Sequence, residues 1–374
     1  MIFGLIIISA IYFILIGFFV LGFSLVKRFD KKTATHSTKF SIIIPFRNET
    51  ENLPKLLKSL DKLDYPKNLF EVILIDDDSS DNSVELIMRL SMSTQLDFKI
   101  IKSRRQSNSP KKDAISTAIN IANYDWIVTT DADCLVPEKW LNTYDAFIKT
   151  KAPKMVIAPV TYHAGNSFLD QFQLLDFMSL QGATIAGFGL RSPFLSNGAN
   201  MAYSKELFIS LNGFDGNDNI ASGDDIFLLE KATRLHKKQV GYLKSKNVIV
   251  ITNPQSTLTS LIQQRVRWAA KASAYKNSFG KLVGLIVLLM NATLITAFIL
   301  NLVGELSLLY FSAILIIKLI ADYLLIYKIT HFFNQKRVLK FYLISSLIYP
   351  LFSVFIAVYA MFFDFKWKGR TFKA

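Results

Sequence analysis

The chain has 374 residues, a formal net charge of +14 and 51% hydrophobic residues, more apolar than a soluble domain requires, so part of it is expected to lie in lipid. Much of the positive charge clusters beside apolar segments, which favours a membrane surface over nucleic acid as partner. The only cysteine, Cys134, excludes an intrachain disulfide framework and a multi-cysteine metal site, as expected for a domain in the reducing cytoplasm.

Residues 1–26 are almost wholly apolar and long enough to cross a hydrocarbon core of roughly 30 Å. Positive charge follows this run instead of preceding it, and no small-residue cleavage site stands out, so a transmembrane anchor is favoured over a signal peptide. The basic residues that follow predict that the polar region starts on the cytoplasmic side of the inner membrane. They are Lys27, Arg28, Lys31 and Lys32.

Residues 38–257 alternate short β-rich runs with polar helical stretches, which predicts an α/β domain of parallel strands and crossover helices. Expected strands cover residues 40–44, 70–75 and 127–130, and an expected helix covers residues 48–60. The second and third strands run directly into acidic clusters. Because ligands bind at the carboxyl ends of strands in open α/β sheets, the two clusters are expected to share one site.

The first acidic cluster is Asp76-Asp77-Asp78, ahead of a helix expected to begin near Ser83. One aspartate there suits a turn or a helix cap, but three exceed that need, and one is expected to accept hydrogen bonds from a nucleobase or ribose. The second cluster places Asp131 and Asp133 one residue apart. Alternate residues of an extended chain face the same side, so both carboxylates can approach one ligand.

Carboxylate oxygens and substrate phosphates are the ligands that Mg²⁺ or Mn²⁺ prefers, so Asp133 is a candidate metal ligand. Taken alone, an Asp-x-Asp pair is more often a solvated turn. Lys111 lies between the two clusters in sequence, either as a solvated loop charge or as a phosphate contact.

Asp224 and Asp225 follow Gly223 at an expected helix start, where the helix dipole alone favours acidic residues. The functional alternative makes one of them a general base. Residues 258–280 are expected to contain an amphipathic interfacial helix, for which basic and aromatic residues are ordinary. Gln264, Arg267 and Trp268 nevertheless share one helix face, which would offer an indole and a guanidinium to a sugar diphosphate.

Three late apolar runs, near residues 282–303, 306–327 and 341–363, predict C-terminal transmembrane helices within residues 281–364. Lys318 and Asp322 lie four apart in the second of these runs and are expected to pair on one helix face. If every run spans, the basic tail of residues 365–374 ends outside, against the positive-inside rule, so one run is expected to be interfacial or re-entrant. The basic residues of this tail are Lys366, Lys368, Arg370 and Lys373.

Together these motifs resemble family-2 glycosyltransferases, in particular the membrane-embedded branch of cellulose, hyaluronan and poly-N-acetylglucosamine synthases. The resemblance covers about residues 40–268, and the Gln-x-x-Arg-Trp match at residues 264–268 is its most specific part. Two positions depart from the family pattern: Asp224 replaces the more usual Glu, and Asp78 replaces a small turn residue. The resemblance implies a GT-A-like, Rossmann-type domain that binds a nucleotide sugar, with one N-terminal and about three C-terminal transmembrane helices.

The resemblance also implies residue roles. Asp225 is the expected catalytic base, with Asp224, Gln264, Arg267 and Trp268 near the acceptor and the diphosphate, while Asp133 binds the metal. The expected donor-binding residues are Pro45, Glu49, Asp77, Lys111, Asp131 and Asp133.

The implied reaction is inverting transfer of a sugar from a nucleotide diphosphate sugar, by family resemblance a UDP-sugar, to a saccharide or a lipid-linked acceptor, with nucleic acid excluded as a partner. Two alternatives stay open. A metal-dependent phosphosugar or nucleotidyl transferase acting on a membrane lipid phosphate would use similar aspartates. A non-catalytic membrane scaffold would not need all four motifs.

Overall fold

The computed structural model describes residues 2–31, 35–91 and 96–372, so Met1, Lys32 and Lys373 lie outside the described residues. The chain forms two compact units, and each is built from separate segments of sequence. Residues 27–163 and 196–253 form one unit, here termed the sheet unit. Residues 1–26, 164–195 and 254–374 form the other, here termed the helical unit.

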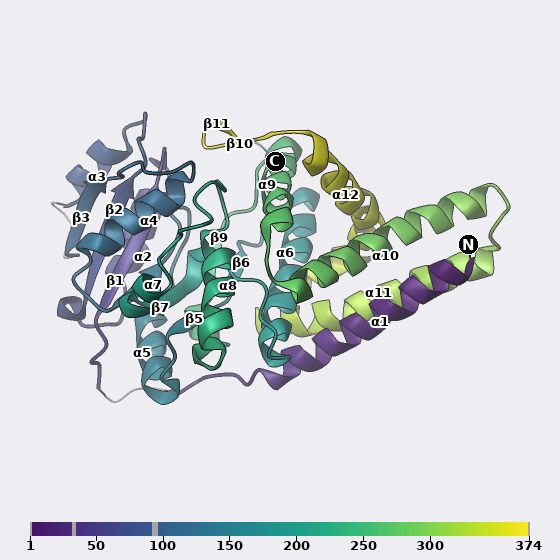
Figure 1. Cartoon of the computed structure of the whole chain (residues 1–374), viewed down its shortest axis with the longest axis horizontal. Coiled ribbons are helices and arrows are strands. Elements are labelled where there is room, and N and C mark those ends of the chain that lie inside the picture. The colour runs from purple at the N-terminus through teal and green to yellow at the C-terminus, as the bar shows by residue number, and fades with distance from the viewer. Residues whose placement is uncertain (1, 32–34, 92–95, 373–374) are drawn as a thin grey trace. The chain divides into compact units, whose positions relative to one another are not determined.

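The sheet unit is built on a seven-stranded sheet in the order β3-β2-β1-β4-β7-β5-β8 (Figure 1). Strands β1 to β4 pair in parallel, whereas β7 runs antiparallel to both β4 and β5. Almost every residue of β1 and β2 is buried, as expected for parallel strands covered on both faces. The strands are β1 Phe40–Phe46, β2 Phe70–Asp76, β3 Phe98–Lys102, β4 Trp126–Thr129, β5 Met155–Ile157, β7 Met201–Ser204 and β8 Val240–Tyr242, with a separate parallel pair of β6 Val160–Tyr162 and β9 Val250–Thr252.

Helices and short 3-10 turns connect these strands. The helices are α2 Leu53–Asp61, α3 Ser83–Ser91, α4 Pro110–Ile121, α5 Trp140–Lys151, α7 Lys205–Ser210 and α8 Asp224–His236, and the 3-10 turns are η1 Lys67–Leu69, η2 Gly198–Asn200, η3 Lys237–Gln239 and η4 Lys246–Val248. Helix α2 begins later than the expected residue 48, because Asn48 is left-handed with φ 53° and its side-chain oxygen accepts from the Ser80 N–H at 2.8 Å. Helix α3 begins at Ser83, as expected.

The helical unit contains α1 Ile2–Leu25, α6 Phe168–Gly189, α9 Leu258–Ala270, α10 Ser278–Leu302, α11 Leu308–Phe332 and α12 Tyr342–Phe362, together with η5 Lys271–Ala274, η6 Lys336–Phe341 and a hairpin of β10 Phe365–Trp367 and β11 Arg370–Phe372. In the described part of the chain, four helical segments are long and apolar enough to cross a membrane: residues 2–25, 278–302, 308–332 and 336–362. This confirms the expectation of one early and three late candidate spans. Figure 1 shows α1 and α11 running side by side.

A buried polar cluster joins α1 to α11. The Lys318 ammonium lies 2.5 Å from the Asp322 carboxylate, and the Tyr12 hydroxyl donates to the same carboxylate at 2.5 Å. The expected pair therefore forms, with a third member from another helix. Two opposite charges and a hydroxyl satisfy one another, which lowers the cost of burying them in an apolar helix bundle.

Helix α6 lies within the range 38–257 proposed as the catalytic domain, yet it groups with the long apolar helices. It approaches α1 closely: a Cβ atom added to Gly189 would lie 1.9 Å from the Gly22 carbonyl oxygen. Small residues allow such close approach between helices. The domain boundaries inferred from the sequence remain a proposal, and α6 shows that the catalytic range includes a helix of the other unit.

Candidate active site

The first two acidic clusters leave the same edge of the sheet. Strand β1 lies between β2 and β4, and all three are parallel, so their carboxyl ends point the same way. Phe46 pairs with Asp76 in the register, and the Phe46 carbonyl accepts the Asp77 N–H at 2.8 Å. On the other side of β1, the Thr130 N–H donates to the Ile43 carbonyl at 3.3 Å. Strand pairing thus carries both clusters to one edge, as the sequence predicts.

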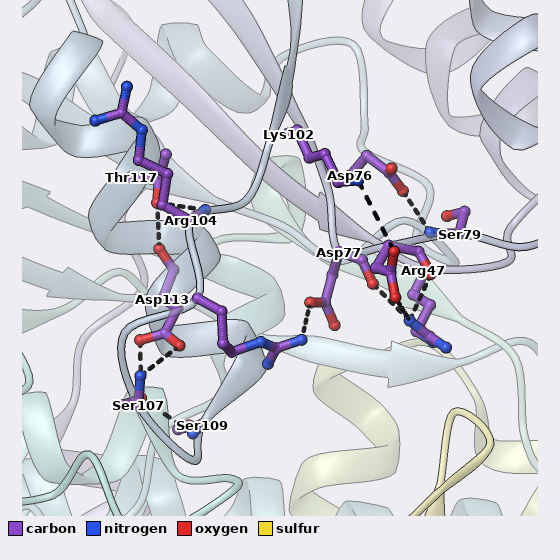
Figure 2. Close-up of polar contacts among 12 residues, drawn as sticks. Arg47, Asp76, Asp77, Ser79, Lys102, Arg104, Ser107, Ser109, Asp113 and Thr117 are labelled. Atoms are coloured by element: carbon purple, nitrogen blue, oxygen red, sulfur yellow. Dashed lines mark hydrogen bonds and ion pairs between the residues drawn. The ribbon is translucent and has the colours of Figure 1, made fainter.

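The three aspartates of the first cluster have different surroundings (Figure 2). Asp76 accepts the Ser79 N–H at 2.9 Å, which is the ordinary turn role. Asp77 is buried, and its carboxylate lies 2.7 Å from the Arg105 guanidinium. Asp78 adopts a left-handed φ of 65°, and its backbone carbonyl, like that of Asp77, accepts from Arg47. Only Asp77 therefore combines burial with a cationic partner.

The start of α4 holds the loop of residues 104–107, in which Figure 2 labels Arg104 and Ser107 beside Thr117 and Asp113. Asp113 Oδ2 accepts the backbone N–H groups of Gln106 at 3.0 Å and Ser107 at 2.9 Å, and Oδ1 accepts the Ser107 hydroxyl at 2.8 Å. The Arg104 N–H donates to the Thr117 hydroxyl at 3.3 Å. Buried Asp113 thus organises the backbone from which Arg105 reaches Asp77.

Lys111 joins the second acidic cluster, at Asp131, to the Asp224-Asp225 pair. Its Nζ atom lies 2.6 Å from Asp131 Oδ1 and 3.3 Å from Asp224 Oδ2. Burial disfavours the charged ammonium, but the carboxylates of Asp131 and Asp224 outweigh burial and raise the pKa of Lys111 above its ordinary value. Lys111 therefore stays cationic and brings together two motifs that lie 93 residues apart in sequence.

Asp225 is fixed by backbone donors. Its Oδ2 accepts the Gly198 N–H at 3.2 Å, and its Oδ1 accepts the N–H of Ile226 at 2.7 Å. Gly223 precedes the two aspartates with φ 87°, a left-handed conformation that glycine adopts without steric cost. Asp224 and Asp225 are both buried in the first turn of α8, where the helix dipole favours their charge.

Gly198 is the point at which these elements meet. Its carbonyl accepts the Thr129 hydroxyl at 2.7 Å, and its N–H donates to Asp225. A Cβ atom at Gly198 would lie 2.7 Å from Asp224 Oδ2 and 3.4 Å from Lys111 Nζ. The end of β4 and the start of α8 therefore pack against a residue at which a Cβ atom would force the Asp224 carboxylate to shift.

The carboxylates of the site suit a metal held jointly by the protein and a substrate better than a metal held by the protein alone. Within residues 2–31, 35–91 and 96–372, no three His, Cys, Asp or Glu side chains gather as a metal cage. Asp131 is paired with Lys111, and the half-buried Asp133 accepts from the Cys134 thiol at 3.7 Å. Mg²⁺ is usually held by one or two carboxylates together with substrate phosphates. Asp133 offers a carboxylate oxygen, the type of ligand that Mg²⁺ prefers, and the phosphates of a substrate would supply further oxygen ligands.

The other two expected donor-binding residues lie near the same edge. Pro45 is half-buried in β1, paired in register with Ile75. Glu49 is buried just after the strand: its carboxylate accepts the Asn52 side-chain amide at 2.7 Å, and its N–H donates to the Ser83 hydroxyl at 2.8 Å. In this structure Glu49 thus joins the segment after β1 to the start of α3.

A cavity of about 450 Å³ lies in the sheet unit between α4, α7 and residues 212–218. Its lining includes Lys112 and Asp113, the neighbours of Lys111, but none of the predicted site residues. Lys112 donates to the carbonyls of Asn217 at 2.6 Å and Ile220 at 2.9 Å, so it supports the loop that precedes Gly223. The predicted site residues Asp77, Asp131, Asp133, Asp224 and Asp225 do not line this cavity.

The Gln-x-x-Arg-Trp motif of residues 264–268, here termed the fourth motif, lies on α9 in the helical unit. Its side chains have different partners. Gln264 contacts Arg265, and the Arg267 guanidinium lies 4.7 Å from the centre of the Trp367 ring. Trp268 contacts Arg265 and Phe177. Gln264, Arg267 and Trp268 share a helix face, but they do not all contact the same residues of the helical unit.

Sequence reasoning missed several of these partners. Arg47 and Arg105 lie in loops, Arg105 directly after Arg104, and no spacing singles either of them out. Gly198 carries no motif at all. Helix α6 did leave a signal, because Ser167 and Asp170 form a capping box ahead of a long apolar stretch.

Part of the chain is similar to known proteins. Residues 41–211 match the model described as glycosyl transferase family 2. The poly(ribitol-phosphate) beta-N-acetylglucosaminyltransferase TarS of Staphylococcus aureus is 31% identical over 110 residues, which make up 29% of this chain and 19% of that protein. The poly-beta-1,6-N-acetyl-D-glucosamine synthase of Staphylococcus epidermidis is 25% identical over 230 residues, 61% of this chain and 53% of that protein. The chain thus spans about half or less of each relative.

The mannosyltransferase PcManGT of Pyrobaculum calidifontis, solved with GDP-Man and Mn²⁺, resembles this structure with a TM-score of 0.58. The two are 19% identical, and the match covers 94% of this chain and 99% of that one. This likeness concerns the fold, and it confirms the expected GT-A-like α/β architecture.

Proposed function

Residues 41–211 match the model described as glycosyl transferase family 2, and from that premise we propose that the protein is an inverting glycosyltransferase. It transfers a sugar from a nucleotide diphosphate sugar to a hydroxyl of an acceptor beside a membrane. The observation that carries this proposal is the Lys111 bridge, with Nζ at 2.6 Å from Asp131 and 3.3 Å from Asp224. It brings the expected donor-binding carboxylate beside the motif that contains the expected base.

In the proposed reaction, Asp225 takes the proton of the acceptor hydroxyl as that oxygen attacks the anomeric carbon. The bond from the anomeric carbon to the phosphate oxygen breaks, and the nucleoside diphosphate leaves with the bonding electrons. Attack opposite the leaving group inverts the anomeric centre, so an α-linked donor yields a β-linked product. The hydrogen bonds from Gly198 and Ile226 hold the Asp225 carboxylate in place for this task.

Negative charge grows on the departing diphosphate, and charge stabilisation is usually the largest contribution in a shielded site. Asp133 is the residue proposed to hold a divalent metal, and a bound Mg²⁺ or Mn²⁺ supplies electrostatic stabilisation of the phosphates. Arg267 is proposed to assist at the diphosphate and Trp268 to close over the acceptor sugar. Pro45, Glu49, Asp77 and Asp131 are proposed to contact the donor.

The donor proposed is a UDP-sugar, and the acceptor a saccharide or a lipid-linked saccharide. Four candidate membrane spans support an integral membrane protein. The basic residues after α1 support a cytoplasmic catalytic domain at the inner membrane. One relative is named for the synthesis of poly-beta-1,6-N-acetyl-D-glucosamine, which supports a saccharide acceptor.

A donor screen tests the proposal. Membranes containing the protein are incubated with labelled nucleotide sugars, and released nucleotide and labelled product are measured. Release of a nucleoside diphosphate with label in a saccharide or lipid fraction is expected. Release of a nucleoside monophosphate or pyrophosphate would instead support the phosphosugar or nucleotidyl transferase, which the family match does not favour.

A further inference from the structure

A buried ion pair links α6 to α9 in the helical unit. Arg265 Nε lies 2.6 Å from Asp176 Oδ2, and both side chains are only 6% exposed. Tyr349 of α12 also interacts electrostatically with Asp176. Burying two charges costs free energy unless geometry and further hydrogen bonds compensate. The short distance between the two charges, with Gln264 in contact with the same guanidinium, holds the Arg265 side chain in place.

Arg265 in turn holds Trp268. Its guanidinium carbon lies 4.2 Å from the centre of the indole, within the range of a cation–π contact. Phe177, the neighbour of Asp176 on α6, contacts the same indole, with ring centres 6.2 Å apart and planes at 40°. Consecutive residues of α6 thus act on Trp268, one through Arg265 and one directly. The indole remains half-buried, so part of its surface is still exposed.

Arg265 and Arg267 therefore have different surroundings, although both belong to the fourth motif. Arg265 is buried against Asp176, whereas Arg267 is half-buried and lies over Trp367 of the C-terminal hairpin. The arginine between Gln264 and Val266 is thus built into the packing of the helical unit.

We propose that Asp176 is a positioning residue for the acceptor: through Arg265 it sets the plane of the Trp268 indole. This rests on the proposed function, in which Trp268 closes over the acceptor sugar. Loss of the Asp176 carboxylate frees Arg265 and lets the indole turn. An aromatic ring binds a sugar well only when its face is correctly oriented. The acceptor then binds less tightly, while donor binding is unchanged.

The test measures acceptor and donor KM of the full chain in membranes for Asp176→Asn, Trp268→Ala and the double variant. Asp176→Asn is expected to raise the acceptor KM about tenfold, the loss expected from one well-desolvated cation–π arrangement, with the donor KM unchanged. In the Trp268→Ala background, Asp176→Asn is expected to add no further loss, because both changes act on the same indole. Independent, multiplicative effects would overturn the proposal.

Two further variants separate positioning from folding. Removing one partner of a buried ion pair is strongly destabilising, whereas replacing both with apolar residues is often tolerated. Asp176→Leu combined with Arg265→Met should therefore fold and still show the raised acceptor KM. Asp176→Glu keeps a carboxylate at this position and should restore much of the acceptor affinity that Asp176→Asn loses. An acceptor KM unchanged in the folded double variant would overturn the proposal.

Nucleoside diphosphate release by the wild-type protein, measured with donor and acceptor together, distinguishes the failure of this inference from that of the proposed function. If no nucleotide sugar releases a nucleoside diphosphate, the proposed function fails. If the diphosphate is released but Asp176 and Trp268 act independently, only the positioning role fails.

Discussion

The Nζ atom of Lys111 lies 2.6 Å from Oδ1 of Asp131, so the residue after the β4 edge is paired with the first turn of α4. The same ammonium lies 3.3 Å from Asp224. The sequence predicts two alternatives for Lys111, a solvated loop charge or a phosphate contact. Its side chain is only 16% exposed, which excludes the solvated alternative, and its partners here are carboxylates.

Lys111→Met should lower kcat about 100-fold or more, because it leaves Asp131 and Asp224 close together in a shielded site without their shared cation. Nucleoside diphosphate release from the best donor measures this. Lys55→Met, which removes an exposed lysine of α2, is the matched control and should keep full activity. Equal turnover of Lys111→Met and Lys55→Met would remove Lys111 from the site.

Asp77→Asn should raise the donor KM at least tenfold with kcat unchanged, since a hydrogen bond to a charged group contributes about 1.5–3 kcal/mol. Arg105→Gln should change the donor KM less than about fivefold, because the Arg105 side chain is 41% exposed and such ion pairs contribute at most about 1 kcal/mol. Steady-state kinetics over a donor series gives both values. A larger loss for Arg105→Gln than for Asp77→Asn would reverse the assigned roles.

Gly198→Ala should reduce both activity and thermal stability. Its Cβ atom would lie 2.7 Å from Asp224 Oδ2, and such overpacking typically costs about 1–3 kcal/mol. Gly284→Ala is the matched control, because a Cβ there has no atom within 4 Å. Thermal unfolding in detergent should show a lowered midpoint for Gly198→Ala alone. Equal midpoints and equal activities would show that the site tolerates a side chain at Gly198.

Stability should fall in acid partly through Glu71. Burial favours its neutral form, but Lys99, Ser41 and Asn123 outweigh burial and lower the pKa of the Glu71 carboxyl below its usual 4.5. Hydrogen bonds from Ser83 and Thr50 likewise outweigh burial and lower the pKa of Asp81 to about 2. A lowered pKa stabilises the folded state above the unfolded pKa, and this contribution is lost as pH falls through the folded value.

The Glu71→Gln variant should therefore be less stable than the parent at neutral pH, and the difference should shrink as the pH falls below about 4.5. Thermal midpoints of the purified protein across this pH range measure it. Glu85→Gln, at an exposed position with a 3.9 Å pair to Arg89, should match the parent at every pH. A difference for Glu71→Gln that does not depend on pH would contradict the electrostatic explanation.

Local patterns sufficed for much of the sheet and for the candidate membrane helices. Residues 70–75 and 127–130 are short apolar runs that end in aspartates, and strand pairing on either side of β1 brings their ends to one edge. The apolar runs are long enough to be recognised by composition alone. Such features depend on neighbouring residues, so they can be read without the fold.

Contacts between distant segments could not be predicted in the same way. Arg105 reaches Asp77 only because Asp113 folds the loop back, and Arg265 reaches Asp176 across 89 residues. Nothing near Gly198 marks it as the residue that supports Asp225. The hairpin of residues 365–372, whose Trp367 covers Arg267, was expected only as a basic tail.

The most direct test compares the wild-type protein with Asp225→Asn and the matched control Asp218→Asn, which alters an acidic residue outside the predicted site. Purified protein is given its best donor and acceptor with Mn²⁺ or with a chelator, and nucleoside diphosphate release is measured. We predict that Asp225→Asn loses at least about 100-fold in kcat, that the control keeps its rate and that chelation abolishes turnover. Full turnover by Asp225→Asn, or undiminished transfer in the chelator, would contradict the proposed site.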